Sequence, residues 1–461
     1  MQRTLFHKNA YNTTEPVKSF WESSVNYSKD DFKEIENNEN CDVAIIGAGF
    51  TGLSAALHLS KDYNIDVKVL EAGHIGWGAS GRNGGFCCIS PTALTDEQLI
   101  KKFGINETKI FYESQIEAVQ LVNQICKEYN IDCDITGNGF FEIAHKSSEM
   151  KEFSEWGSQL SKLFGIKTKL LSKEEFTKIG YESNNQFGAL HLDLGFGLNP
   201  LKFLLGLARS AKFNGAKIYQ KSRVTRWEKA NGKNILHTKS ASIRADKVII
   251  ATNGYTLDDL HPSLSGRFLP AISNIVVTRP MSDTELALHQ MKTTTPMSTS
   301  HHLFYYYRKL PDNRMLFGAR GGMTGSPKEE EKMRVWLSGK FKEMFPLWNN
   351  IDITHFWSGF VCLTTSLTPA IGSLNEDKSV FFSFGYHGNG VNTGPWAGKK
   401  LADLIGASNS KNLVISKVMS GLPKELPFPF PLLRYSPRGR RLLRQIIIRS
   451  AYAYYRFRDL F

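Results

Sequence analysis

The sequence predicts an α/β fold in which a parallel sheet, assembled from separate stretches of the chain, carries an inserted domain with an antiparallel sheet. Three observations support this. Residues 41–60 combine a buried strand, a glycine-rich turn and a helix. Residues 247–252 and 380–384 are apolar runs typical of buried parallel strands, and residues 270–354 read as antiparallel strands with turns. A chain of 461 residues is long enough for two such domains.

The first unit carries glycines at a fixed spacing. Residues 42–46 are expected to form its strand and residues 53–60 its helix. Between them, Gly47, Gly49 and Gly52 stand at G-x-G-x-x-G spacing. In such a unit the first glycine makes the tight turn, the second lets the backbone approach a pyrophosphate, and the third lets the helix pack close to the strand. We interpret the unit as the start of a Rossmann-like, dinucleotide-binding domain; a plain glycine-rich turn is the alternative.

A second strand and a loop extend this site. The strand at residues 67–70 ends in Glu71, where an acceptor for a ribose hydroxyl belongs. Residues 76–86, G-W-G-A-S-G-R-N-G-G-F, hold five glycines and form neither a regular helix nor a strand. We expect a bound dinucleotide to order this loop, whose strong polar groups are Arg82 and Asn83. A plain surface loop is the alternative.

The chain then leaves the parallel sheet and returns to it. Helical patterns at residues 110–129 and 149–163 flank a strand at 139–144. A helix at 201–214 and short strands lead back, and Val224 lies where backbone groups can meet an adenine ring.

The inserted segment is expected to end in a hairpin and a helix. Residues 302–308 and 314–319 are its two strands, joined by the turn at 311–313, and residues 329–345 form an amphipathic helix.

A second glycine-rich turn favours a flavin. Residues 385–395, G-Y-H-G-N-G-V-N-T-G-P, lead into a helix at 396–405, with Pro395 just inside its start. Glycine-rich turns at helix N-termini bind anions. Because the first turn already serves the pyrophosphate, the second needs another anion, which a reduced flavin supplies. This argues for FAD over NAD.

The net charge of +13 is concentrated in a C-terminal tail. Residues 434–461 hold eight arginines against one acid, Asp459, and contribute +7 of the total. The charge therefore describes a tail, and nucleic-acid binding is not expected. We expect a closing helix packed on the body, with peripheral contact to an anionic membrane surface as the alternative.

Cysteine usage and hydropathy indicate a cytoplasmic protein. The six cysteines lack paired C-x-x-C spacing, so we predict no metal site and expect reduced thiols. The first 40 residues lack the apolar core of a signal peptide, and no run of 18 apolar residues exists.

Motifs in a fixed order along the chain resemble those of the FAD-dependent amine and D-amino-acid oxidase superfamily, which includes glycine and sarcosine oxidases, and more narrowly its γ-glutamylputrescine oxidase branch. The motifs are C-D-V-A-I-I-G-A-G-F-T-G at 41–52, V-L-E-A at 69–72, G-W-G-A-S-G-R-N-G-G-F at 76–86, A-T-N-G-Y at 251–255, Y-Y-R-K-L-P-D-N-R-M-L-F-G-A-R at 306–320, T-P-A-I-G at 368–372 and G-Y-H-G-N-G-V at 385–391.

The resemblance implies noncovalent FAD and the oxidation of a C–N bond in a small-molecule amine. Hydride passes to flavin N5, the imine hydrolyses, and O2 reoxidises the flavin to give H2O2. One alternative is a dehydrogenase that passes electrons to a membrane quinone or carrier; another is a non-catalytic flavin-binding partner protein. The implied cofactor contacts are Gly47, Gly49, Phe50, Thr51, Gly52, Glu71, Ala72, Gly78, Ala79, Ser80, Arg82, Asn83, Gly84, Gly85, Val224, Thr252, Asn253, Gly388, Asn389, Gly390 and Val391.

The sequence departs from relatives at positions near the substrate. Val361 stands where relatives that oxidise α-amino acids often place a carboxylate-binding Arg, and Asn392 stands where sarcosine-oxidising relatives have a Lys. Phe86 replaces a common Gln, which favours a more apolar pocket. Cys362 lies where some relatives attach the flavin, but its spacing differs by one residue, and we interpret it as a buried thiol.

The catalytic candidates are one histidine and two tyrosines. His387 is the titratable group expected nearest the flavin ring. Strand alternation sends Tyr305 and Tyr307 to one face and Phe304 and Tyr306 to the other. We assign Tyr305 and Tyr307 to the pocket; sheet core is the alternative for either pair.

These elements divide the chain into four parts. The predicted parts are an N-terminal arm (1–40), the FAD-binding domain (41–95, 200–269 and 355–410), the substrate domain (96–199 and 270–354) and the basic tail (411–461). The identity of the amine, the electron acceptor and the oligomeric state are left open.

Overall fold

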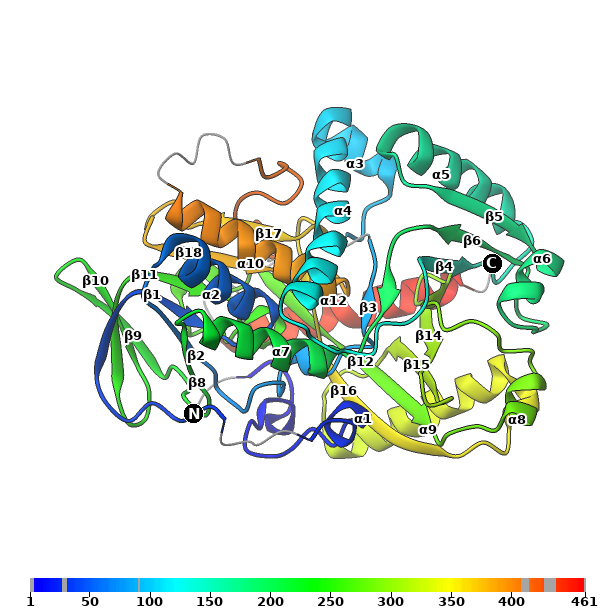
Figure 1. Ribbon diagram of the computed structural model, residues 1–461, viewed down its shortest axis with the longest axis horizontal. Coiled ribbons are helices and arrows are strands. Elements are labelled where there is room, and N and C mark those ends of the chain that lie inside the picture. The colour runs from blue at the N-terminus through cyan, green and yellow to red at the C-terminus, as the bar shows by residue number, and fades with distance from the viewer. Residues whose placement is uncertain (1–3, 27–30, 90–91, 408–413, 427–436, 460–461) are drawn as a thin grey trace.

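The computed structural model describes residues 4–26, 31–89, 92–407, 414–426 and 437–459. Two large sheets lie at opposite ends of the molecule, the first on the left and the second on the right of Figure 1. The described helices and strands follow the mixed pattern that the sequence predicts.

The first sheet is mainly parallel and is assembled from three separate stretches of chain. Its order is β17-β18-β11-β1-β2-β8, and every pairing along it is parallel except β17–β18. Its strands are β1 (Glu39–Ile46), β2 (Val67–Leu70), β8 (Lys217–Tyr219), β11 (Ser242–Ile250), β17 (Ala370–Ser373) and β18 (Val380–Phe384), with the hairpin of β9 (Arg226–Ala230) and β10 (Lys233–His237) added beside β11. This confirms the strands predicted at 67–70 and 380–384.

Three helices pack together beside this sheet. Helix α2 (Phe50–Tyr63) contacts both α7 (Pro200–Phe213) and α10 (Gly390–Gly406). Helix α10 begins six residues earlier than predicted, so Pro395 lies inside it and not at its start. The contact with α2 explains this difference: a Cβ on Gly398 would lie 2.3 Å from the Thr51 carbonyl oxygen, and burial of this kind outweighs weak helix propensity.

The second sheet is antiparallel except where β13 meets β4. Its order is β16-β12-β15-β14-β13-β4-β6-β5. Its strands are β4 (Phe140–Ile143), β5 (Thr168–Ser172), β6 (Gly188–Leu192), β12 (Phe268–Thr278), β13 (Met297–Thr299), β14 (Tyr305–Lys309), β15 (Met315–Arg320) and β16 (Ile353–Thr364). Strands β14 and β15 form the predicted hairpin, with Lys309 opposite Met315.

The remaining helices include the three predicted from periodicity. Helix α5 (Glu149–Phe164) packs on β5 and β6, and α9 (Pro327–Met344) packs on β12 and β16. The other α-helices before the C-terminal tail are α1 (Phe20–Ser23), α3 (Asp96–Phe103), α4 (Ile105–Glu128), α6 (Lys173–Ile179) and α8 (Asp283–Ala287). A two-stranded ribbon joins β3 (Phe86–Cys87) to β7 (Phe196–Gly197).

Strand pairing moves one predicted boundary. Residues 355–364 were assigned to the FAD-binding domain, but they lie in β16, which pairs with β12 along the second sheet. Helix α4 was assigned to the substrate domain, yet it contacts α10. A domain boundary inside β16 would divide one continuous strand pairing, so we propose that this boundary lies after Thr364. The division into two domains otherwise stays a prediction.

The basic tail contains a packed helix, α12 (Pro437–Arg458), coloured red in Figure 1. Ile448 packs with Leu5 and Phe6 of the N-terminal arm. Leu442 and Phe457 are exposed, so membrane contact stays a prediction. None of the described helices is both long enough and apolar enough to span a membrane. Arg434 and the side chains of Arg438, Arg440, Arg441 and Arg456 lie outside the described residues.

An ion pair between Arg444 of α12 and Asp258 connects this helix to the rest of the protein. Arg444 donates from Nη1 and Nη2 to the two carboxylate oxygens of Asp258, each at 2.7 Å. The Arg444 side chain is 5% exposed, so its charge has little access to water. We expect Asp258→Asn to lower the free energy of unfolding by about 2 kcal/mol, because it leaves a buried guanidinium without its counter-charge. Urea denaturation measures this change.

Asp352→Asn is the matched control. Its side chain is 83% exposed, and its contact with Arg279 is 4.0 Å long. We expect this variant to lie within about 0.5 kcal/mol of the unchanged protein. Equal losses for the two variants would show that the Arg444 pair does not stabilise the docking of α12.

Candidate functional site

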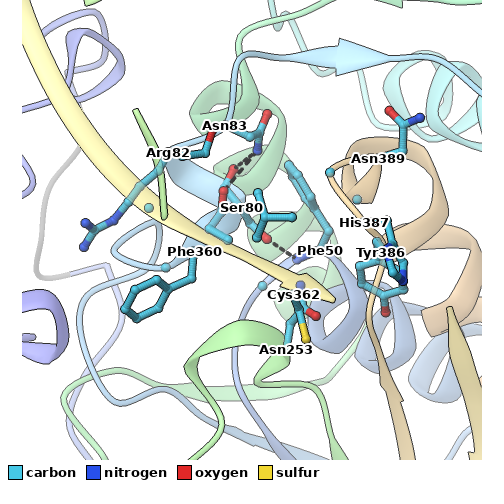
Figure 2. Close-up of a pocket in the computed structure, with 18 of the residues that line it drawn as sticks. Phe50, Ser80, Arg82, Asn83, Asn253, Phe360, Cys362, Tyr386, His387 and Asn389 are labelled. Carbon is cyan, nitrogen blue, oxygen red and sulfur yellow. Dashed lines mark hydrogen bonds between the residues drawn. The ribbon is translucent and has the colours of Figure 1, made fainter. Parts of the chain in front are cut away.

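A cavity of about 850 Å³ is lined by residues of both sheets. Its lining includes 19 of the 21 residues predicted to contact the cofactor, all except Gly52 and Gly85. Figure 2 shows how the loops that carry these residues converge on it. The structure therefore brings the separated motifs of the sequence together in one place.

The first glycine turn shapes one part of the cavity. Gly47 has φ +105°, and a Cβ on it would lie 2.9 Å from the Ala251 carbonyl oxygen. Gly52 does not line the cavity, because it faces the turn itself: its Cβ would lie 2.0 Å from the Gly47 carbonyl oxygen. Gly85 is likewise a packing residue, with its Cβ position 1.9 Å from the Leu198 carbonyl oxygen. Both glycines allow close approach of backbone, which is a different role from contact with a ligand.

Glu71, which follows β2, forms a hydrogen bond with the backbone of the first glycine turn. Its two carboxylate oxygens accept hydrogen bonds from the backbone N–H groups of Ala48 and Gly73, each at 2.9 Å. A carboxylate has about four acceptor positions, so these two bonds leave capacity for the hydroxyls of a ribose. Glu71 and Ala72 both line the cavity at this point.

The loop at 76–86 is held by its own polar side chains. Ser80 Oγ accepts from the Phe50 N–H at 2.9 Å, which ties the loop to the start of α2 (Figure 2). Asn83 Nδ2 donates to the carbonyl oxygens of Ala79 and Ser80. Arg82 donates to the Trp77 and Ser358 carbonyl oxygens and lies over the Trp77 ring. Arg82 and Asn83 thus line the cavity but are already engaged in shaping the loop.

The returning segments carry the residues at 224, 252 and 253 that were predicted to contact the cofactor, and all three line the cavity. Val224 lies in the link between β8 and β9. Asn253 Oδ1 accepts from the Gly385 N–H at 2.9 Å, which joins this segment to the late glycine turn.

The late glycine turn carries His387. Its imidazole Nε2 lies 3.2 Å from Thr364 Oγ1, and its carbonyl oxygen accepts from Arg320 Nη2 at 2.7 Å. Nδ1 is buried and has no hydrogen-bond partner in the described structure. Burial, assisted by the positive charge of Arg320, lowers the pKa of His387 to about 3. His387 is therefore neutral at physiological pH and only a weak base.

The pKa of His387 predicts a specific acid sensitivity. Below pH 6.5 the unfolded chain takes up a proton here that the folded protein refuses until about pH 3, so stability falls as pH drops through this window. Between pH 7 and pH 5 we expect the loss to be about 2 kcal/mol larger than in His387→Asn. Asparagine tolerates the φ of +50° at this position.

Urea denaturation at pH 8, 7 and 5 checks this expectation. The two proteins should change nearly in parallel between pH 8 and pH 7, where the ring is mostly neutral in both the folded and the unfolded state. Parallel losses between pH 7 and pH 5 as well would contradict the buried, neutral state of His387.

The structure corrects the tyrosine assignment. Tyr307 is fully buried in the core, and its hydroxyl lies 2.7 Å from that of Tyr181. Tyr305 stacks on Phe317, and neither tyrosine lines the cavity. The opposite face of β14 lines it instead, with Phe304 and Tyr306. Alternation separated the two pairs correctly, but it does not say which face meets the ligand.

Several ionisable residues at the cavity were missed, and two of them, Arg320 and Glu142, lie on strands of the second sheet. Arg320 ends β15, lies over the Phe304 ring, and has no carboxylate within ion-pair distance among the described residues. Burial lowers its pKa. Glu142 lies on β4 and accepts a hydrogen bond from Ser298. The signal in the sequence was a carboxylate inside the otherwise apolar strand F-F-E-I.

The cavity fits a dinucleotide with two anionic regions. Helices α2 and α10 both begin at it, and neither Gly49 nor Asn389 caps its helix with a side-chain hydrogen bond. The first N–H groups of a helix need partners, and anions supply them. The buried, unpaired Nδ1 of His387 is a further polar atom that a ligand can satisfy.

Comparison with known proteins agrees with this geometry. Residues 42–404 match the family described as FAD dependent oxidoreductase. The chain is 29% identical over 447 residues to the γ-glutamylputrescine oxidoreductase of Escherichia coli (strain K12), covering 97% of this chain and 99% of that protein.

Solved structures show the same fold. Glycine oxidase from Geobacillus kaustophilus matches with a TM-score of 0.69 at 19% identity, over 84% of this chain and all of its own. L-Proline dehydrogenase from P. horikoshii matches with a TM-score of 0.68 at 21% identity, over 83% of this chain and 96% of its own. The predicted fold class is therefore confirmed.

Proposed function

Because the chain belongs to the family of FAD-dependent oxidoreductases, we propose that it oxidises a C–N bond of a small amine, one resembling γ-glutamylputrescine or another primary or secondary amine. The observation that carries this proposal is that one cavity is lined both by the FAD motifs and by ionisable and aromatic side chains of the second sheet. The 29% identity to a γ-glutamylputrescine oxidoreductase supports the same substrate class.

When bound, FAD would accept a hydride from the carbon next to the nitrogen and pass its two electrons to O2, which gives H2O2. The chain's own residues bind and orient the substrate. Phe86 meets Tyr306 edge to face, with ring centroids 5.5 Å apart, and together with Phe304 they form an apolar wall that excludes water. Burial raises the pKa of Tyr306 to about 12, so its hydroxyl stays neutral.

Arg320 is the candidate for orienting an anionic group of the substrate. Val361, at the position where the resemblance implies a carboxylate-binding arginine in relatives that oxidise α-amino acids, lines the cavity. Arg320 offers a guanidinium on β15 instead, and among the described residues only its Nη2 donates to a protein acceptor, the carbonyl oxygen of His387. The fork of guanidinium donors matches a carboxylate. A substrate with a carboxylate remote from the reacting amine would use it.

Anaerobic titration of the purified protein with amines tests the proposal. We expect the protein to bind FAD and the flavin absorbance to bleach with amines of this class. Admission of air should then release H2O2 in proportion to the amine consumed. A flavin that no amine bleaches would contradict the proposal and favour a non-catalytic partner protein. Bleaching without peroxide would favour a dehydrogenase. The cytoplasmic location stays a prediction.

A further inference from the structure

One end of the cavity is acidic, although the protein as a whole carries a net charge of +13. Glu142 on β4 and Glu149 and Glu152 on α5 line this part, which we call the acidic end. Phe140, Phe153 and Trp156 line it as well. Carboxylates among aromatic rings form an environment that attracts organic cations.

Glu149 and Glu142 differ in the hydrogen bonds and the counter-charges that neighbouring residues supply to their carboxyl groups. Glu149 accepts hydrogen bonds from Ser300 and from the His145 N–H, and it pairs with His145 Nδ1 at 2.9 Å; these contacts lower its pKa. Glu142 accepts one assigned hydrogen bond, from Ser298 Oγ to Oε2 at 2.6 Å. No cation lies within 4 Å of it in the described part of the chain.

The lack of a counter-charge among the described residues affects the pKa of Glu142. Burial, with a further contribution from the charge of Glu149, raises the pKa of Glu142 to about 8. A buried carboxylate without a cation is costly, and the cost falls when a ligand brings the cation. The hydrogen bond from Ser298 fixes the orientation of the Glu142 carboxyl group, so a cationic ligand would meet it in a defined position.

We propose that Glu142, held by Ser298, binds a protonated nitrogen of the substrate that is separate from the nitrogen undergoing oxidation. This inference rests on the proposed amine oxidation. A carbon can give up hydride only when its nitrogen has a free lone pair to stabilise the developing positive charge. A nitrogen kept protonated by a carboxylate has none. The preferred substrates are therefore amines that carry a second basic nitrogen, such as diamines, with one nitrogen to be oxidised and one to bind Glu142.

Binding of two matched amines to the FAD-loaded enzyme tests this. The probes are 1,4-diaminobutane and 1-aminobutane, which share the reacting end and differ in the second nitrogen. Isothermal titration calorimetry is done anaerobically on enzyme whose FAD has first been reduced with dithionite, so that neither amine is oxidised and the heats report both dissociation constants. We expect the unchanged enzyme to bind the diamine at least about tenfold more tightly than the monoamine, which is the scale of one charged hydrogen bond. Glu142→Gln should remove this preference by weakening the diamine alone.

Two further variants complete the experiment. Glu142→Asp keeps the charge and should retain part of the preference, which separates the role of the carboxylate from damage to the fold. Glu155→Gln changes an exposed acid on α5 that lies outside the cavity and should leave both constants within about twofold. The flavin absorbance spectrum checks that each variant holds FAD.

Two results would overturn the inference: an unchanged enzyme without preference for the diamine, or Glu142→Gln that keeps the preference. These are distinct from failure of the proposed function. If the diamine binds with the expected preference but never bleaches the flavin, the amine-oxidation proposal fails, while Glu142 stands as a cation site.

Discussion

Replacement of Gly52 with valine is expected to give a protein that holds no FAD and has no oxidase activity. A Cβ at this position would lie 2.0 Å from the Gly47 carbonyl oxygen and 3.2 Å from the Ile45 side chain. The obstacle is backbone, so no rotamer change relieves it, and α2 must move away from the turn. We expect a loss of about 3 kcal/mol or more in the free energy of unfolding.

The same displacement of α2 should also weaken the binding of FAD. Moving α2 displaces the Phe50 N–H from Ser80 and withdraws the helix N-terminus from the cavity. Absorbance at flavin wavelengths after purification and titration of the apoprotein with FAD measure the loss, which we expect to be at least about 100-fold in the dissociation constant, or about 2.7 kcal/mol.

Gly339→Val is the matched control. Gly339 lies on α9, and a Cβ there has nothing within 4 Å. Valine in a helix is slightly better than glycine, so we expect unchanged FAD binding and a stability within about 0.5 kcal/mol of the original. If Gly52→Val also retained FAD, the close packing of α2 against the turn would not be required for the cofactor site.

Arg320→Met is expected to produce the largest catalytic effect among cavity substitutions. Removal of one partner from a buried charge pair costs about 2–5 kcal/mol, so we expect kcat/KM for amines that carry a carboxylate to fall about 100-fold or more. Amines without a carboxylate should lose much less. Steady-state kinetics with both kinds of substrate measure the difference.

Arg320→Lys separates charge from geometry. Lysine keeps the positive charge but lacks the planar fork, so we expect an intermediate loss. The methionine variant also removes a neighbouring charge that lowers the pKa of His387, so that pKa should rise while burial still holds it below its ordinary value. A carboxylate-bearing amine turned over equally well by Arg320→Met would remove Arg320 from substrate binding.

Local pattern was sufficient where a residue's role depends on its near neighbours. The strand at 67–70, the glycine spacing and the hairpin of β14 and β15 were all predictable, because turn geometry and alternation are set over a few residues. The start of α10 was not, because contact with α2 extends the helix across a glycine-rich stretch.

The sequence could not predict which face of a strand lines the cavity. Alternation groups Tyr305 with Tyr307 and Phe304 with Tyr306, but both faces of β14 are covered, one by the core and one by the cavity. Residues 355–364 show the same limit, since only the pairing of β16 with β12 places them in the second sheet.

The sequence by itself determined the parallel sheet, the dinucleotide turn with Gly47, Gly49 and Gly52, and FAD as the cofactor, because these depend on motifs whose spacing is fixed by local backbone geometry. Tertiary structure alone decided the substrate end of the cavity. Arg320 and Glu142 come from distant strands, and neither has a counter-charge in the described part of the chain. The lack of a counter-charge matters only in the folded chain, because an ionisable group without a partner costs free energy when it is removed from water.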